Sequence, residues 1–253
     1  MRFLVAIPVY NEEKYLSDVL DCARKFSDDI LVINDGSRDN SAGVARAMGV
    51  EVVEHPANYG YGRTLRDAFA WAVDRKYDVV ITMDADLQHL PRYIPAFLYA
   101  IPDYDIVSGS RYLAPQPGDT APPPDRMRIN GIVTGLINSF TGYGLTDSFC
   151  GFKAYKADAL ARLDLREDGY AMPLELWIQA ASRGLTVKEI PVSLIYLDTN
   201  RTFGHDIDDP EKRLEYYRAV IEREVGRAGL TPAAGAAARS RGGNDEVRRA
   251  PKE

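Results

Sequence analysis

The chain has 253 residues, 45% of them hydrophobic, which is enough to bury a substantial core in one large domain or two closely packed ones. Its formal net charge of −6 argues against a nucleic-acid-binding protein, because a phosphate backbone requires a basic surface. Two cysteines are too few for a disulfide framework, and with no signal peptide or apolar run of membrane-spanning length we expect a cytoplasmic protein.

Predicted strands and helices alternate through the first 110 residues. Short apolar, β-branched runs predict five strands: residues 3–9, 30–33, 50–53, 79–83 and 105–108. Apolar residues at helical spacing predict the intervening helices: one capped by Asn11, one ending at Gly49, one around Leu65–Ala72 and one over residues 91–100. This alternation is typical of an α/β protein with a doubly wound, mostly parallel sheet.

The pattern changes after residue 110. Residues 114–125 contain five prolines and predict a mobile loop. Apolar spacing predicts three further helices: residues 129–140, 173–184 and 209–227. A strand over residues 187–197, interrupted by Pro191, is expected at a sheet edge. We expect one domain over residues 1–228, followed by a disordered, low-complexity tail over 229–253.

The stretch after the fourth predicted strand carries the strongest chemical signal. Asp84, Asp86 and Gln88 follow the apolar run, and alternate side chains of an extended segment point the same way. Ligands of open α/β sheets bind at the carboxyl ends of strands, and oxygen ligands suit a hard cation such as Mg²⁺ or Mn²⁺. We therefore predict a divalent-metal site, although Asp after a strand is also a common cap for a following helix, here one starting near Pro91.

Five motifs occur in order along residues 3–205. They are Ile7-Pro8-Val9-Tyr10-Asn11-Glu12, Asn34-Asp35-Gly36-Ser37, Asp84-Ala85-Asp86-Leu87-Gln88-His89, Gly109-Ser110-Arg111 and Asp147-Ser148-Phe149-Cys150-Gly151-Phe152-Lys153. Together they resemble the motifs of family-two glycosyltransferases, and the nearest branch is the dolichyl-phosphate mannose or glucose synthases. The resemblance implies the GT-A fold, a Rossmann-like sheet with flanking helices, with a donor half over about 1–112 and an acceptor half over about 113–228.

The same resemblance implies an inverting enzyme that uses Mg²⁺ or Mn²⁺ to transfer a hexose from a donor such as GDP-mannose or UDP-glucose. It places the nucleoside and the donor phosphates near Pro8, Tyr10, Glu12, Asp35, Asp84 and Arg201. It assigns the metal to Asp84, Asp86 and Gln88, and the departing diphosphate to Asp86 and Arg111. Read alone, either arginine could be a surface ion-pair member, and Glu12 or Asp35 could serve only a helix start or a turn.

The acceptor is less determined than the donor, because Cys150 and Lys153 stand where the family usually has Ser and Arg. A polyprenyl phosphate, implied by the nearest branch, arrives largely ionised and would be held by Arg111, Arg128 or Arg201 at the inner face of a membrane. A soluble sugar hydroxyl would need a general base, for which Asp147 and Glu175 are the candidates, although Glu175 could be structural. The sequence is compatible with a homo-oligomer.

Other functions fit less well. A phosphatase with an Asp-x-Asp motif needs a Thr soon after its second Asp, whereas Leu87 and Gln88 stand there. A P-loop kinase needs a Gly-rich Lys-Ser/Thr loop, which the sequence lacks. A non-catalytic nucleotide-sugar-binding module remains an alternative, and the retained metal-binding residues favour an enzyme over it.

Overall fold

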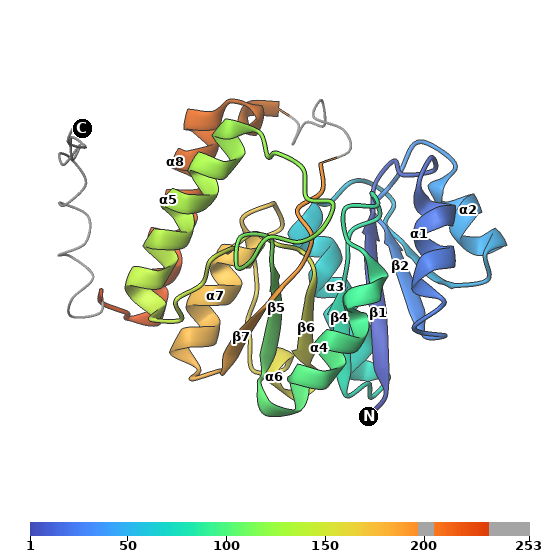
Figure 1. Cartoon of the computed structure of the whole chain (residues 1–253), viewed down its shortest axis with the longest axis horizontal. Coiled ribbons are helices and arrows are strands. Elements are labelled where there is room, and N and C mark those ends of the chain that lie inside the picture. Colours follow the sequence, from blue (N-terminus) through green and yellow to red (C-terminus); the bar gives the residue numbers. More distant parts are fainter. Residues whose placement is uncertain (197–204, 233–253) are drawn as a thin grey trace, which may run out of the picture.

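The computed structural model of the protein describes residues 1–196 and 205–232. Its centre is a seven-stranded sheet with the strand order β3-β2-β1-β4-β6-β5-β7 (Figure 1). The strands are β1 (Phe3–Val9), β2 (Ile30–Asn34), β3 (Glu51–Glu54), β4 (Val79–Thr82), β5 (Ile106–Ser110), β6 (Lys153–Lys156) and β7 (Val187–Pro191). Neighbouring strands are parallel except where β6 is involved, so the predicted mostly parallel sheet is confirmed.

Helices cover both faces of the sheet. They are α1 (Leu16–Ala23), α2 (Ser41–Ala47), α3 (Tyr61–Asp74), α4 (Ile94–Ala100), α5 (Pro124–Thr141), α6 (Ala157–Leu160), α7 (Met172–Ser182) and α8 (Pro210–Ala228), with 3₁₀ turns at Pro91–Tyr93, Ile101–Asp103 and His205–Asp208. Successive residues of β1 point to opposite faces: Leu4 and Ala6 pack with α3 and α7, whereas Val5 and Ile7 pack with α1 and α4. Burial on both faces explains why this strand is a continuous apolar run.

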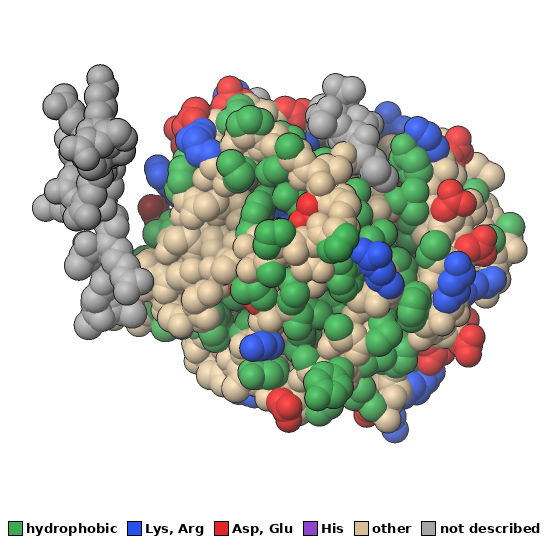
Figure 2. All heavy atoms as spheres, in the orientation of Figure 1, with side chains coloured by type: hydrophobic (Ala, Val, Ile, Leu, Met, Phe, Trp, Pro, Cys, Tyr) green, Lys and Arg blue, Asp and Glu red, His purple; other side chains and the backbone are tan. Residues whose placement is uncertain are grey.

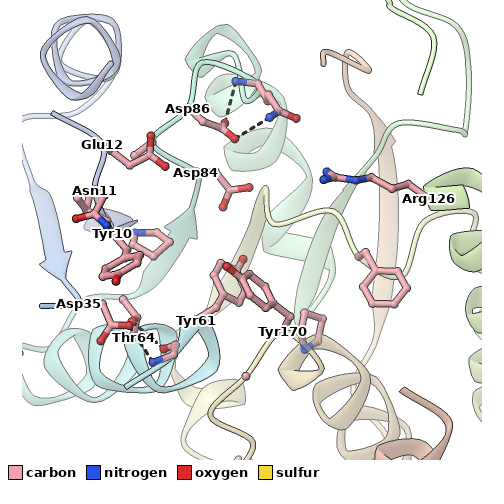
Figure 3. A pocket seen from close by; sticks show the side chains of 18 of the residues that line it. Tyr10, Asn11, Glu12, Asp35, Tyr61, Thr64, Asp84, Asp86, Arg126 and Tyr170 are labelled. Carbon is pink, nitrogen blue, oxygen red and sulfur yellow. Dashed lines mark hydrogen bonds between the residues drawn. The ribbon is translucent and has the colours of Figure 1, made fainter. Parts of the chain in front are cut away.

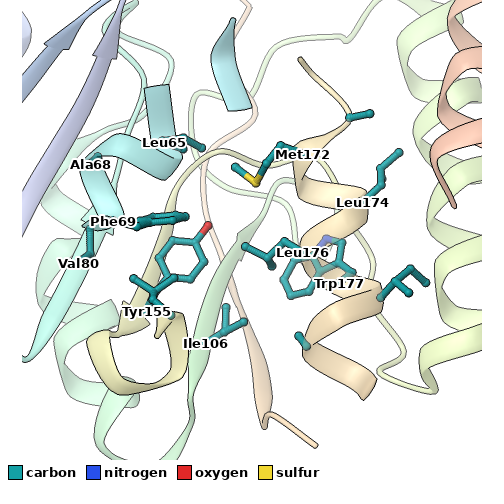
Figure 4. Close-up of a cluster of buried hydrophobic side chains, with 14 of the residues drawn as sticks. Leu65, Ala68, Phe69, Val80, Ile106, Tyr155, Met172, Leu174, Leu176 and Trp177 are labelled. Atoms are coloured by element: carbon teal, nitrogen blue, oxygen red, sulfur yellow. The ribbon is translucent and has the colours of Figure 1, made fainter. Parts of the chain in front are cut away.

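Figure 4 shows the core between α3, α7 and the sheet. Phe69 of α3 meets Tyr155 of β6 edge to face, with ring centroids 5.0 Å apart. Trp177 of α7 is fully buried, and its indole N–H donates to the carbonyl of Ser148 at 2.9 Å. A buried indole N–H needs a hydrogen-bond partner, and this bond supplies one while it links the loop before β6 to α7.

The strand β6 was not predicted. It lies between β4 and β5 and runs antiparallel to both. Its first residue, Lys153, is buried, with Nζ bonded to the carbonyl of Cys150 and lying 5.4 Å from the centroid of the Trp177 ring. A lysine in a buried position interrupts the apolar run by which a central strand is recognised.

Two other local predictions were wrong. Asn11 does not cap a helix, since α1 begins at Leu16, and the Asn11 side chain accepts the backbone N–H of Arg38 instead. The strand β7 lies at the sheet edge as predicted, but it ends at Pro191. The chain then leaves the sheet and bonds to the Pro-rich loop.

The Pro-rich loop is tied to the segment that follows β7, rather than being free of contacts. The backbone N–H of Thr120 donates to the carbonyl of Leu194 at 2.7 Å, and the N–H of Leu194 donates to Asp119 Oδ1 at 2.8 Å. The N–H of Tyr196 donates to the Thr120 hydroxyl at 2.8 Å. These bonds cross-link two loops that border the same end of the sheet.

The helices α5 and α8 lie side by side at one end of the molecule (Figure 1), joined by the ion pair between Arg213 and Asp125 at 2.7 Å. Asp209 caps α8 as predicted, because its Oδ1 accepts the N–H groups of Glu211 and Lys212. Leu230, within the predicted tail, packs against the core, and the rest of that prediction falls on residues 233–253, which lie outside the described ones.

On the face shown in Figure 2, acidic and basic side chains are interspersed and lie mostly towards its rim. Within residues 1–196 and 205–232, no helix combines the length and the apolar composition needed to cross a membrane.

Candidate active site

A cleft of about 1000 Å³ opens at the carboxyl ends of β1, β2 and β4. The sequence-predicted residues that line it are Pro8, Tyr10, Glu12, Asp35, Asp84, Asp86, Gln88 and Arg111. In Figure 3, Glu12, Asp84 and Asp86 lie on one side of the cleft and Arg126 reaches in from the opposite side. The cleft therefore sets acidic groups from the first half of the chain against a basic group from the second.

Asp84 and Asp86 stand on a tight turn after β4. Gln88 closes the turn, because its backbone N–H donates to Asp86 Oδ1 at 3.1 Å and its side-chain amide donates to Asp86 Oδ2 at 2.7 Å. His89 Nδ1 accepts the backbone N–H of Asp84 at 2.9 Å, and its ring stacks on Phe152 with centroids 5.3 Å apart. Gln88 thus supports Asp86 in this structure, and its role as a metal ligand stays a prediction.

The environment of Asp84 and Asp86 favours the binding of positive charge. Burial raises the pKa of Asp84, although Arg111 and Lys153 act in the opposite direction. Burial, and then the neighbouring charge of Asp84, raise the pKa of Asp86. Two adjacent, partly buried carboxylates ionise together only at a free-energy cost, which a bound cation would offset.

The two carboxylates suit a divalent cation that is coordinated partly by the protein and partly by a substrate. The described part of the chain holds no group of three or more His, Cys, Asp or Glu side chains able to hold a metal by themselves. Mg²⁺ and Mn²⁺ sites, however, commonly use one or two carboxylates and fill the remaining positions with water and phosphate oxygens. Asp84 and Asp86 supply that minimum.

The opposite end of the cleft is built by the loops after β1 and β2. Tyr10 is 41% exposed, whereas Glu12 and Asp35 are buried. The Asp35 carboxylate accepts the backbone N–H of Tyr59 on Oδ1 and that of Gly60 on Oδ2, each at 2.9 Å. Asp35 is therefore fixed in place by a loop that reaches it from the next strand and helix.

Arg111 and Asp147 form one unit. Arg111 donates Nε to Asp147 Oδ2 at 2.6 Å and Nη2 to Oδ1 at 3.0 Å, and Asn130 donates to the same Oδ1 at 2.7 Å. Burial acts to raise the pKa of Asp147, but the charge and hydrogen bonds of Arg111 outweigh it and lower that pKa to about 2. Such a carboxylate is a weak base. Its effect is to orient Arg111, which lines the cleft.

Glu175 is not brought to the cleft. It is a buried residue of α7, and its carboxylate accepts hydrogen bonds from the backbone N–H groups of Arg166 and Glu167 and from the side-chain amide of Gln179. These bonds hold the loop before α7. Glu175 was predicted as a catalytic candidate, and this geometry instead favours the structural alternative.

The predicted phosphate-binding arginines divide in three ways. Arg111 lines the cleft, Arg201 lies outside the described residues, and Arg128 points away from the cleft and pairs with Glu211. Arg126, two residues earlier on α5, reaches into the cleft instead (Figure 3). Two residues advance a helix by roughly 200°, so the two side chains leave α5 on different faces.

Arg213 of α8 also lines the cleft and was missed in the sequence. It is 3% exposed and paired with Asp125. A signal existed: Arg213 is in helical phase with Tyr217, Val220 and Ile221, which form the buried stripe of α8. A charged residue on an otherwise apolar stripe marks a buried polar role rather than a solvated face.

Comparison with known proteins is consistent with this geometry. Residues 4–164 match the family model described as Glycosyl transferase family 2. An undecaprenyl-phosphate mannosyltransferase from Micrococcus luteus is 31% identical over 207 residues, covering 77% of this chain and 84% of that protein. A polyprenol monophosphomannose synthase from Mycolicibacterium smegmatis is 30% identical over 217 residues, covering 80% of this chain and 79% of that protein.

A similar solved structure is glucosyl-3-phosphoglycerate synthase from Mycobacterium tuberculosis, in complex with Mn²⁺, UDP-glucose and phosphoglyceric acid. It matches with a TM-score of 0.69 at 20% identity, over 92% of this chain and 81% of that one. The likeness, together with the strand order, confirms the predicted GT-A fold.

Proposed function

Because this chain belongs to glycosyl transferase family 2 and is therefore a glycosyltransferase, we propose that it transfers a hexose from a nucleotide diphosphate sugar to a polyprenyl phosphate. We further propose that the reaction inverts the anomeric carbon and depends on Mg²⁺ or Mn²⁺. The names of the two relatives support the acceptor class, and the carboxylates of the cleft support the metal and the donor.

On the donor side, the cleft holds groups that can stabilise the negative charge that develops when a nucleotide diphosphate leaves. Asp84 and Asp86 would hold the cation, which when bound neutralises charge on phosphate oxygens. Arg111 contributes a planar guanidinium, and Asp147 fixes its orientation before any substrate arrives. Tyr10, Glu12 and Asp35 would surround the nucleoside at the other end.

On the acceptor side, one observation carries the proposal: both sequence-predicted candidate bases are already engaged. Asp147 is bonded to Arg111 and Asn130, and Glu175 is bonded to the loop before α7. A hydroxyl acceptor needs a general base, whereas a phosphate monoester is largely ionised at neutral pH and needs only to be positioned. Arg126 and Arg213 supply the positive charge for that positioning. A polyprenyl acceptor also implies peripheral association with a membrane.

The proposal is tested by a transfer assay on the full chain. UDP-glucose and GDP-mannose are each supplied with Mn²⁺ and either a short polyprenyl phosphate or a free hexose, and the glycosylated product is quantified. We expect product with the lipid phosphate, lost in excess chelator and in Asp86→Ala, and retained in the control Asp74→Asn on the exposed end of α3. Product formed only with the free hexose would overturn the acceptor assignment. Donor binding without turnover towards any acceptor would indicate a non-catalytic module.

A further inference from the structure

His55 is a buried residue just beyond β3 that none of the predicted motifs includes. Its Nδ1 lies 2.6 Å from Asp35 Oδ1, and its Nε2 lies 2.9 Å from Asp67 Oδ2, without the alignment of a hydrogen bond at Nε2. Since an ionised carboxylate only accepts hydrogen bonds, Nδ1 is the donor in the bond to Asp35. Asp67 is itself held by Arg63 Nε at 2.8 Å, so an anchored carboxylate of α3 lies beside the other edge of the imidazole ring.

The bonds to Asp35 can be counted. Oδ1 accepts from His55 Nδ1 and from the backbone N–H of Tyr59, and Oδ2 accepts from the backbone N–H of Gly60. An ionised carboxylate has about four acceptor positions, two on each oxygen. Among the described residues these three donors occupy both positions of Oδ1 and one of Oδ2. One acceptor position, on Oδ2, is left for a molecule in the cleft that Asp35 lines.

The loop that carries the N–H donors of Tyr59 and Gly60 cannot easily move away from Asp35. A Cβ added to Gly36 would lie 2.4 Å from the backbone of Ala57, and one added to Gly60 would lie 2.4 Å from the carbonyl oxygen of Asp168. Contacts this close mean that the loop is packed tightly between its neighbours. The arrangement of donors around Asp35 is thus preorganised rather than formed on binding.

We propose that His55 is a positioning residue that keeps Asp35 as a single hydrogen-bond acceptor for the donor nucleobase, and thereby selects uracil over guanine. This rests on the proposed function, which places a nucleotide sugar in the cleft. Uracil offers one ring N–H between two carbonyl groups, and a single acceptor satisfies it. Guanine offers two adjacent donors that pair best with both oxygens of a carboxylate. With Oδ1 occupied, one guanine donor stays unpaired in a buried site, which weakens binding.

The test uses the full chain, Mn²⁺, and UDP and GDP as calorimetric probes. For the unmodified protein we expect UDP to bind on the order of tenfold more tightly than GDP, as one unpaired buried donor implies. His55→Asn and His55→Gln form a matched pair, because the amide nitrogen of Asn can occupy the place of Nδ1, whereas that of Gln corresponds to Nε2. His55→Asn should keep the UDP affinity and the UDP-to-GDP ratio.

His55→Gln should lose UDP affinity about tenfold and bring the ratio towards one, because it releases a position on Oδ1. In turnover, it should raise the donor KM with little change in kcat, a division that general destabilisation would not produce. Tighter binding of GDP by the unmodified protein, or the same ratio in both variants, would overturn the role of His55 and leave the proposed function intact. Failure of the unmodified protein to bind either nucleotide would remove the proposed function and this inference together.

Discussion

Asp147 shows how a residue that resembles a catalytic base in the sequence takes another role in the fold. Its motif places it near the acceptor, and a lone carboxylate there would suit proton abstraction. The structure surrounds it with the donors of Arg111, Asn130 and the Phe149 backbone, which stabilise its ionised form. Its function is then to hold a guanidinium in place, and the pH dependence of stability should reveal this.

Asp147 should contribute a measurable, pH-dependent stability. Its pKa is lowered from 3.8 to about 2, so ionisation stabilises the fold above about pH 4, and the contribution disappears as the pH falls towards 2. The expected size at neutral pH is about 2 kcal/mol. In urea unfolding, Asp147→Asn should be less stable than the unmodified protein at pH 7, and the difference should shrink between pH 4 and pH 2.

Asp74→Asn, a change at an exposed position, is the control and should follow the unmodified protein at every pH. A difference between Asp147→Asn and the unmodified protein that stays constant down to pH 2 would mean that the charge of Asp147 does not stabilise the fold.

Among the elements, α5 faces both the cleft and the solvent. Arg126 and Asn130, one turn apart, lie towards the cleft, whereas Met127, Arg128 and Ile132 are exposed. This division assigns the two neighbouring arginines different roles, which the sequence alone did not separate.

Arg126→Ala should raise the KM for the polyprenyl phosphate by roughly tenfold or more, because hydrogen bonds to charged groups are worth about 1.5–3 kcal/mol. Arg128→Ala is its matched control, since Arg128 pairs with Glu211 on the outer face, and it should stay within about twofold of the unmodified protein, as surface ion pairs contribute little. Steady-state kinetics with the acceptor varied at saturating donor measures both. Equal effects of the two substitutions would contradict the assignment of the acceptor phosphate to the inner face of α5.

The elements also show which parts of the site could be read from the sequence. Asp84, Asp86 and Gln88 are neighbours in the chain, so the sequence predicted that they would meet at the cleft, although a tight turn after β4 brings them together rather than an extended strand. Arg213 reaches the same cleft only because α8 packs against α5, a contact between segments that local patterns do not encode. The sequence left Glu175 open between a catalytic and a structural role for the same reason, because only the fold shows that its carboxylate lies against a loop rather than in the cleft.

At the scale of the whole molecule, the proposed acceptor requires a surface that meets lipid. Exposed apolar side chains lie on the solvent side of α5 and in the loop before it: Met127 is 53% exposed, Ile132 37% and Leu113 42%. Apolar side chains on one face of a helix can enter the interfacial region of a bilayer without spanning it.

We expect the protein to sediment with vesicles that contain anionic lipid, and the double substitution Met127→Ser and Ile132→Ser to reduce the bound fraction several-fold. Tyr99→Ser serves as the control, because Tyr99 is 89% exposed but lies on α4. A protein that stays in the supernatant, or an equal loss in the control, would show that this face of α5 does not meet the membrane.

The antiparallel strand β6 also determines when the fold can form during synthesis. β4 and β5 do not pair with each other, because β4 lies between β1 and β6 and β5 lies between β6 and β7. β4 is therefore not enclosed until residue 156 has left the ribosome, and β5 not until residue 191 has. Contacts between such distant segments form slowly, and open strand edges favour aggregation in the meantime. The first 112 residues carry four of the five sequence motifs, yet they cannot complete the sheet that positions them. An exchange of this segment between relatives would therefore have to carry β6 with it.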